Sequence, residues 1–151
     1  MDSWTRRVTT RHNSAGWETI SSPEIFIAAA GRTGNIRLGT GVISLPDHHP
    51  YMVASRMVLL DHLTKGRVIL GVGPGALTSD AVMLGIDPAR QREMMDQSLN
   101  IIMRLFTETE PITYKNDRFE MNEAMLRLRP YQQPHLSVAV ASAQSPAGPR
   151  L

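Results

Sequence analysis

The chain has no cysteine and few aromatic residues, and each shortage removes a class of explanation. Without cysteine there is no disulfide framework, no thiolate metal ligand and no cysteine nucleophile. Aromatic residues make up only 5% of the 151 residues, and the formal net charge is only +2. So small an excess of basic residues, scattered along the chain, does not predict a nucleic-acid-binding surface.

Long hydrophobic runs are also missing. No stretch approaches the roughly 18 apolar residues of a membrane-spanning helix. Arg6 and Arg7 are not followed by an apolar segment, so no export signal is predicted and we expect a cytoplasmic protein. The length of 151 residues suits one domain, but it excludes a complete eight-stranded α/β barrel. That fold needs about 250 residues.

The beginning of the chain shows no hydrophobic period. We interpret residues 1–11 as an unstructured leader and residues 12–151 as the domain. The first clear signal is a helix that begins at Pro23, after a serine that can cap it, and continues through Ala30. Gly31 then ends this helix.

The next segments alternate between buried strands and helices. The apolar, β-branched residues 36–45 predict a strand, and residues 67–73 predict another. Between them, apolar residues recur at intervals of three and four from Pro50 to Leu63, which predicts a helix. Two strands that start 31 residues apart, with a helix between them, indicate a β-α-β unit and therefore a parallel sheet.

The second half of the chain interrupts this alternation. A short helix is predicted over residues 78–84, and the longest helix begins at Asp87-Pro88 and ends near Phe106. Asn116-Asp117 then separates two short runs of strand-forming residues, which predicts a hairpin. The third parallel strand follows at residues 136–141. The fold class is therefore α/β with an inserted hairpin, and a further helix could begin at Ser145-Pro146.

Two glycine clusters lie at the ends of predicted strands. Gly39-Thr40-Gly41 indicates either a close approach by a ligand or backbone, or curvature of the sheet. The run from Gly71 to Gly75 admits a nicotinamide-binding loop as an alternative. Pro74 removes a backbone N–H from that run, and Ala76 stands where the third glycine of a dinucleotide motif belongs. A tight turn close to another backbone is therefore the favoured interpretation.

The five histidines do not form a metal-binding pattern. No pair stands four residues apart on a predicted helix, so no metal site is predicted. His12 and His49 lie near the ends of strands, where α/β barrels collect their catalytic residues.

Several runs, in this order and spacing, resemble the luciferase-like flavin-dependent monooxygenases, the family of bacterial luciferase. The resemblance covers the chain from about residue 12 to its end. It rests on His12-Asn13-Ser14-Ala15-Gly16-Trp17-Glu18-Thr19-Ile20, Ile36-Arg37-Leu38-Gly39-Thr40-Gly41-Val42, Leu45-Pro46-Asp47-His48-His49-Pro50, Leu60-Asp61-His62-Leu63-Thr64-Lys65-Gly66-Arg67, Gly71-Val72-Gly73-Pro74-Gly75, and Leu84-Gly85-Ile86-Asp87 with Gln91-Arg92 and Met95-Asp96.

The resemblance implies a partial (β/α)8 TIM barrel that spans strands 3 to 5 with the hairpin inserted. It also implies an oxidoreductase that uses reduced FMN and dioxygen on an aldehyde, ketone or terpene-like substrate. The family's FMN is usually supplied by a separate flavin reductase, and its full-length members are expected to be homo-oligomers. A deazaflavin-dependent hydride-transfer enzyme of the same superfamily is the alternative within the family.

The resemblance also assigns site residues. His12 matches a histidine that assists the oxygen chemistry, and His49 and Asp80 match positions that line the substrate pocket. A non-proline cis peptide is expected near Gly41-Val42. The residues that match cofactor-binding positions are Thr40, Gly41, Ser142, Ala143 and Ser145.

The sequence departs from the family pattern at its start. Arg11-His12-Asn13 stands where the family has Glu-His-His, and residues 1–10 show no strand pattern in place of an expected apolar strand. Strands 1, 2 and 6 to 8 have no counterpart, so the resemblance implies a truncated monooxygenase. An inactive or partner-dependent α/β remnant, with no catalysis of its own, remains the non-enzymatic alternative.

Overall fold

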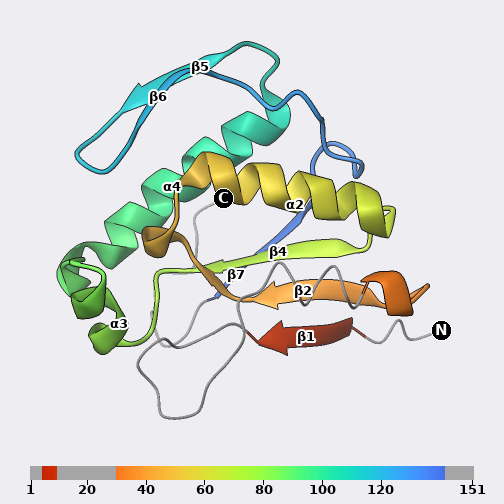
Figure 1. The fold of residues 1–151 in the computed structure, drawn as a ribbon, viewed down its shortest axis with the longest axis horizontal. Helices are drawn as coiled ribbons and strands as arrows, with labels where there is room; N and C mark the ends of the chain where they lie inside the picture. The colour runs from red at the N-terminus through yellow and green to blue at the C-terminus, as the bar shows by residue number, and fades with distance from the viewer. Residues whose placement is uncertain (1–4, 10–29, 142–151) are drawn as a thin grey trace.

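The centre of the fold is a parallel β-sheet. The computed structural model describes the backbone of residues 5–9 and the whole of residues 30–141. The sheet contains β1 (Thr5–Thr9), β2 (Arg37–Gly41), β3 (Ile43–Ser44), β4 (Val68–Gly73) and β7 (Ser137–Val140). Strand β4 pairs with β2, β3 and β7, and β1 pairs with β2, all in parallel. All these strands therefore end at the same edge (Figure 1).

The strand β1 corrects the prediction that residues 1–11 lack structure. Residues Thr5 to Thr9 pair with Arg37 to Gly41 in continuous parallel register. The physical reason is that the backbone groups of a sheet edge can pair with an extended segment whatever its side-chain pattern. Threonine and valine, which favour strands, supply three of its five residues.

The predicted strand over residues 36–45 is divided into two short strands. Strand β2 ends at Gly41, the Gly41–Val42 peptide bond is cis, and β3 resumes at Ile43. A turn of 3-10 helix, η1 (Leu45–Asp47), follows directly. The cis peptide expected from the family resemblance is therefore confirmed at the expected place.

Two helices cover one face of the sheet (Figure 1). Helix α2 (Pro50–Thr64) begins with proline in its first turn and ends at Lys65, which adopts the left-handed conformation. A 3-10 turn, η2 (Pro88–Arg90), leads into α4 (Gln91–Thr107), and the Asp87 side chain accepts a hydrogen bond from Ala89 N–H at 2.9 Å. The predicted helices over 50–63 and 87–106 are thus confirmed. Of the helix predicted from Pro23 to Ala30, only Ala30 is described. The helix continues through Arg32, so the prediction that Gly31 ends it is wrong.

The predicted hairpin, short helix and third strand are also present. The hairpin consists of β5 (Ile112–Lys115) and β6 (Glu120–Ala124), which pair antiparallel. It extends along the outer side of α4 (Figure 1). The short helix α3 (Thr78–Met83) follows β4.

The core lies between the sheet and the two long helices. Its largest fully buried side chains come from η1, α2, β4, α4, β5 and the segment before β7; they are Leu45, Val58, Val68, Leu70, Met95, Ile101, Ile102, Leu105, Phe106, Ile112 and Leu136. Within the described ranges, no helix is long and apolar enough to cross a membrane.

The edge at which the strands begin is held by a buried carboxylate. Asp61 of α2 is fully buried and accepts hydrogen bonds from Tyr131 N–H at 2.9 Å, Gln132 N–H at 3.0 Å and Gln132 Nε2 at 2.7 Å. Gln132 Nε2 also donates to the carbonyl of Val68, at the start of β4. This network fixes α2, β4 and the approach to β7 relative to one another, which leaves the opposite edge to carry the site.

Candidate functional site

The edge at which the strands end begins with an unusual contact between β2 and β4. The backbone pairing of these strands covers Leu38 with Val68 and Gly39 with Ile69. Beyond it, Thr40 Oγ1 donates to the carbonyl of Gly71 and accepts from Gly71 N–H, both at 2.7 Å. The hydroxyl therefore replaces the backbone ladder, and its only hydrogen is already used. Thr40 can contact a ligand by packing, but it has no further proton to donate.

The three glycines of the run from 71 to 75 are explained by close packing at this edge. A Cβ atom on Gly71 would overlap the carbonyl oxygen of Thr40, and one on Gly73 would lie 2.8 Å from Val42 Cγ2. A Cβ on Gly75, where φ is +93°, would lie 2.6 Å from Gln91 Nε2 and 2.8 Å from Ser44 Oγ. The predicted close approach of another backbone is confirmed at Gly71. The run therefore needs no nicotinamide to account for its glycines.

The hydroxyl of Ser44 lies at the end of β3. Its Oγ atom is buried and has no hydrogen-bond partner among the described residues. Burying a hydroxyl without a hydrogen bond costs roughly 1–3 kcal/mol. A ligand that bonds to this hydroxyl would recover part of that free energy. A close-packed strand end and an unsatisfied hydroxyl suit a flat, polar-edged cofactor, and the residues present therefore fit a flavin.

His49 lies beyond η1 and caps helix α2. Its Nδ1 atom accepts a hydrogen bond from Tyr51 N–H at 3.3 Å. The ring centroid lies 5.2 Å from that of Phe119, with the rings tilted by 57°. Burial, followed by the positive charge of Arg118, lowers the pKa of His49 below its ordinary value of 6.5. The neutral imidazole is therefore favoured at neutral pH, with the hydrogen on Nε2 because Nδ1 accepts from Tyr51 N–H.

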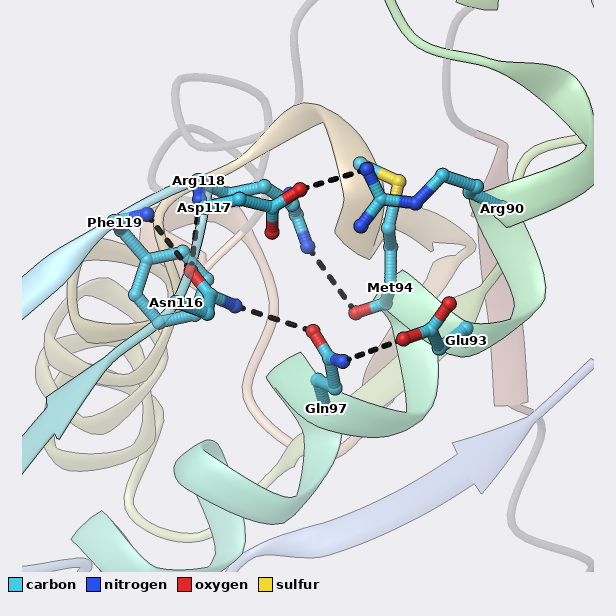
Figure 2. Close-up of polar contacts among 8 residues, drawn as sticks. All are labelled: Arg90, Glu93, Met94, Gln97, Asn116, Asp117, Arg118 and Phe119. Atoms are coloured by element: carbon cyan, nitrogen blue, oxygen red, sulfur yellow. Dashed lines mark hydrogen bonds and ion pairs between the residues drawn. The ribbon is translucent and has the colours of Figure 1, made fainter.

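The tip of the hairpin, residues 116–119, contacts the start of α4 (Figure 2). It also contacts η1 through Arg118. Arg118 Nη2 donates to the carbonyl of Pro46 at 2.8 Å, and its Nη1 donates to the carbonyl of Met94 at 3.3 Å. Burial is the largest cause that lowers the pKa of Arg118. Sequence reasoning missed this residue, because no local pattern predicts a contact between positions 72 residues apart.

The described site residues all belong to the edge at which the strands end. Thr40 and Gly41 close β2, His49 begins α2, and the half-buried Asp80 lies in the first turn of α3, directly beyond β4. Parallel strands bring these positions to one edge, as the family resemblance implies. The other predicted site residues lie outside the described residues: His12, Ser142, Ala143 and Ser145.

Two curated relatives of the chain are monooxygenases. The chain is 60% identical over 141 residues to 4-hydroxyprotoasukamycin monooxygenase of Streptomyces nodosus subsp. asukaensis. It is 50% identical over 141 residues to limonene 1,2-monooxygenase of Rhodococcus erythropolis. Each match covers 93% of this chain but only 38% and 36% of the relatives, respectively. The chain thus spans well under half the length of the curated relatives it matches.

A solved structure extends the similarity to the fold. The oxygenating constituent of 3,6-diketocamphane monooxygenase from Pseudomonas putida, a type II Baeyer–Villiger enzyme in complex with FMN, superposes with a TM-score of 0.77. It is 27% identical, and the match covers 89% of this chain and 40% of that one. Residues 7–151 match the family model of the luciferase-like monooxygenases. The chain therefore belongs to the luciferase-like monooxygenase family.

Proposed function

We propose that this chain forms part of the active site of a monooxygenase that uses reduced FMN and dioxygen to oxidise a small apolar molecule. The observation that carries the proposal is the end of β2, where the carbonyl of Thr40 lies against Gly71 of β4 and the side chain of Val42 lies against Gly73. In a family of monooxygenases, this arrangement supports a flavin site at the edge where the strands end.

We also infer that the sheet is a segment of a (β/α)8 barrel. Its strands are all parallel, and α2 links β3 to β4 on one face. Among the described strands, β1 pairs only with β2, and β7 pairs only with β4. Each of these two strands therefore offers one unpaired side, which suits continuation of the sheet into further strands.

The residues that would hold FMN lie at the strand ends. Thr40 and Gly41 would pack against the ring system, and the Ser44 hydroxyl could donate a hydrogen bond to one of its polar atoms. Ser142, Ala143 and Ser145 would offer backbone N–H and hydroxyl groups to the phosphate. When bound, reduced FMN supplies two electrons to dioxygen, and the protein supplies position and a water-poor surrounding.

The remaining residues would act on the substrate and on protons. His12 would hold or deliver a proton near the reacting oxygen, and His49 and Asp80 would line the substrate pocket. The names of the relatives, which include a limonene monooxygenase, support an aldehyde, ketone or terpene-like substrate. A flavin reductase would supply the reduced FMN.

The test is an anaerobic titration of the purified chain with reduced FMN and, separately, with a reduced deazaflavin. We expect tighter binding of FMN, and Ser44→Ala weakens it about fivefold to tenfold if one hydrogen bond worth about 1 kcal/mol is lost. Thr107→Ala, at the exposed end of α4, is the matched control and leaves binding unchanged. Preferred binding of deazaflavin would favour hydride transfer instead. Binding of neither cofactor would favour an inactive remnant.

A further inference from the structure

The hairpin tip, residues 116–119, is fixed to helix α4 by its own side chains (Figure 2). Asn116 Oδ1 accepts hydrogen bonds from the N–H groups of Arg118 and Phe119, both at 2.9 Å. Asn116 Nδ2 donates to Gln97 Oε1 at 3.1 Å, and Asp117 forms an ion pair with Arg90 at 2.7 Å. These contacts hold the tip in one place over the start of α4.

From that place the tip reaches the loop that carries His49. Arg118 joins the carbonyl of Pro46 in η1 to the carbonyl of Met94 in α4, as described above. Its guanidinium carbon lies 5.5 Å from the centroid of the Phe119 ring, and that ring lies against His49. Phe119 thus contacts the imidazole ring, and Arg118, the preceding residue, holds the loop that carries His49.

We propose that Arg118 and Phe119 are positioning residues for His49, which the hairpin holds in a defined orientation at the edge of the proposed pocket. The inference rests on the proposed function in so far as it takes His49 to face the substrate. It assigns the inserted hairpin a role beyond covering α4, because the hairpin tip contacts the ring of His49.

Charged groups from three elements surround this contact. Arg118 is the charge that acts on His49 itself, and burial acts in the same direction. Arg118 is in turn influenced by Asp117 and Tyr114 of the hairpin region, by Arg90 of η2 and by Asp47 of η1. The arrangement therefore favours the neutral form of His49, in which Nδ1 accepts from Tyr51 N–H and Nε2 carries the hydrogen and can donate it.

The test is an NMR titration of the full chain with isotope-labelled histidine, recorded without flavin. In Arg118→Met, we expect the pKa of His49 to rise toward its ordinary value because a nearby positive charge is gone. In Phe119→Leu, we expect the ring resonances of His49 to shift because the neighbouring aromatic ring is lost. Lys115→Met is the control, since Lys115 lies in the same hairpin and pairs with Glu120 at the surface.

Two further observations keep the proposal open to refutation. The ring of His62 lies against Tyr131, at a centroid distance of 5.5 Å, so its resonances report whether each variant is folded. In the unsubstituted chain, cross-relaxation between the protons of the His49 and Phe119 rings is expected and needs no variant. Absence of that signal, or an unchanged pKa in a folded Arg118→Met chain, overturns the proposal. The histidine titration contains no flavin, so its result does not depend on whether the chain binds FMN. Failure of the proposed function is detected in the separate titration with reduced FMN.

Discussion

Replacement of Gly71 by alanine perturbs the strand contact on which the candidate site depends. The added Cβ would overlap the carbonyl oxygen of Thr40 and lie 3.0 Å from its carbonyl carbon. Both atoms belong to the backbone, so no flexible side chain can move aside. Overpacking of this kind costs about 1–3 kcal/mol. Separation of the strands would also weaken the two hydrogen bonds between Thr40 and Gly71, each worth about 1 kcal/mol.

We therefore expect Gly71→Ala to lower the free energy of unfolding by about 3–5 kcal/mol, a large share of a typical stability of about 5–15 kcal/mol. Urea unfolding followed by circular dichroism measures this change. The matched control is Gly39→Ala, in the neighbouring strand, where the nearest described atom, Ile69 Cβ, lies at an ordinary 3.6 Å. Equal stability of the two variants would refute the explanation of Gly71 by backbone contact.

Two further substitutions test other parts of the structure. Asp61→Asn turns an N–H group toward donors from Tyr131 and Gln132, so urea unfolding should show a loss of about 1–3 kcal/mol; unchanged stability would contradict the role of this carboxylate. The pKa of His49 is lower in the folded chain than its ordinary 6.5, so below pH 6.5 the unfolded chain binds more protons and stability falls as the pH falls. In His49→Gln this part of the decrease disappears, and identical pH profiles of the two chains would contradict the lowered pKa.

Much of the fold could be predicted from sequence because the signals are local. The apolar period from Pro50 to Leu63 indicated helix α2, and Asn116-Asp117 marked the hairpin. Strand β1 could not be predicted, because pairing with β2 depends on backbone groups and leaves no hydrophobic period in residues 5–9. Local sequence signals predict the structure of one segment, whereas the backbone of a sheet edge can pair with any extended segment.

The candidate site was predicted from the family resemblance and not from local signals. The roles of Thr40, Gly41 and His49 stay predictions from the family resemblance, whereas the cis peptide was found where it was expected. The contacts of Arg118 with Pro46 and Met94 had no signal, because they join segments 72 and 24 residues apart. The two hydrogen bonds between the Thr40 hydroxyl and Gly71 also had no signal in the sequence, because they depend on the distance between two strands.

The most direct test of the central claim is calorimetric unfolding of the purified chain under anaerobic conditions, with and without reduced FMN. A ligand that binds only the folded chain adds about 2.7 kcal/mol of stability at one hundred times its Kd. We expect one cooperative transition that moves to higher temperature as reduced FMN is added. A transition indifferent to reduced FMN would contradict the claim that this chain carries a flavin site.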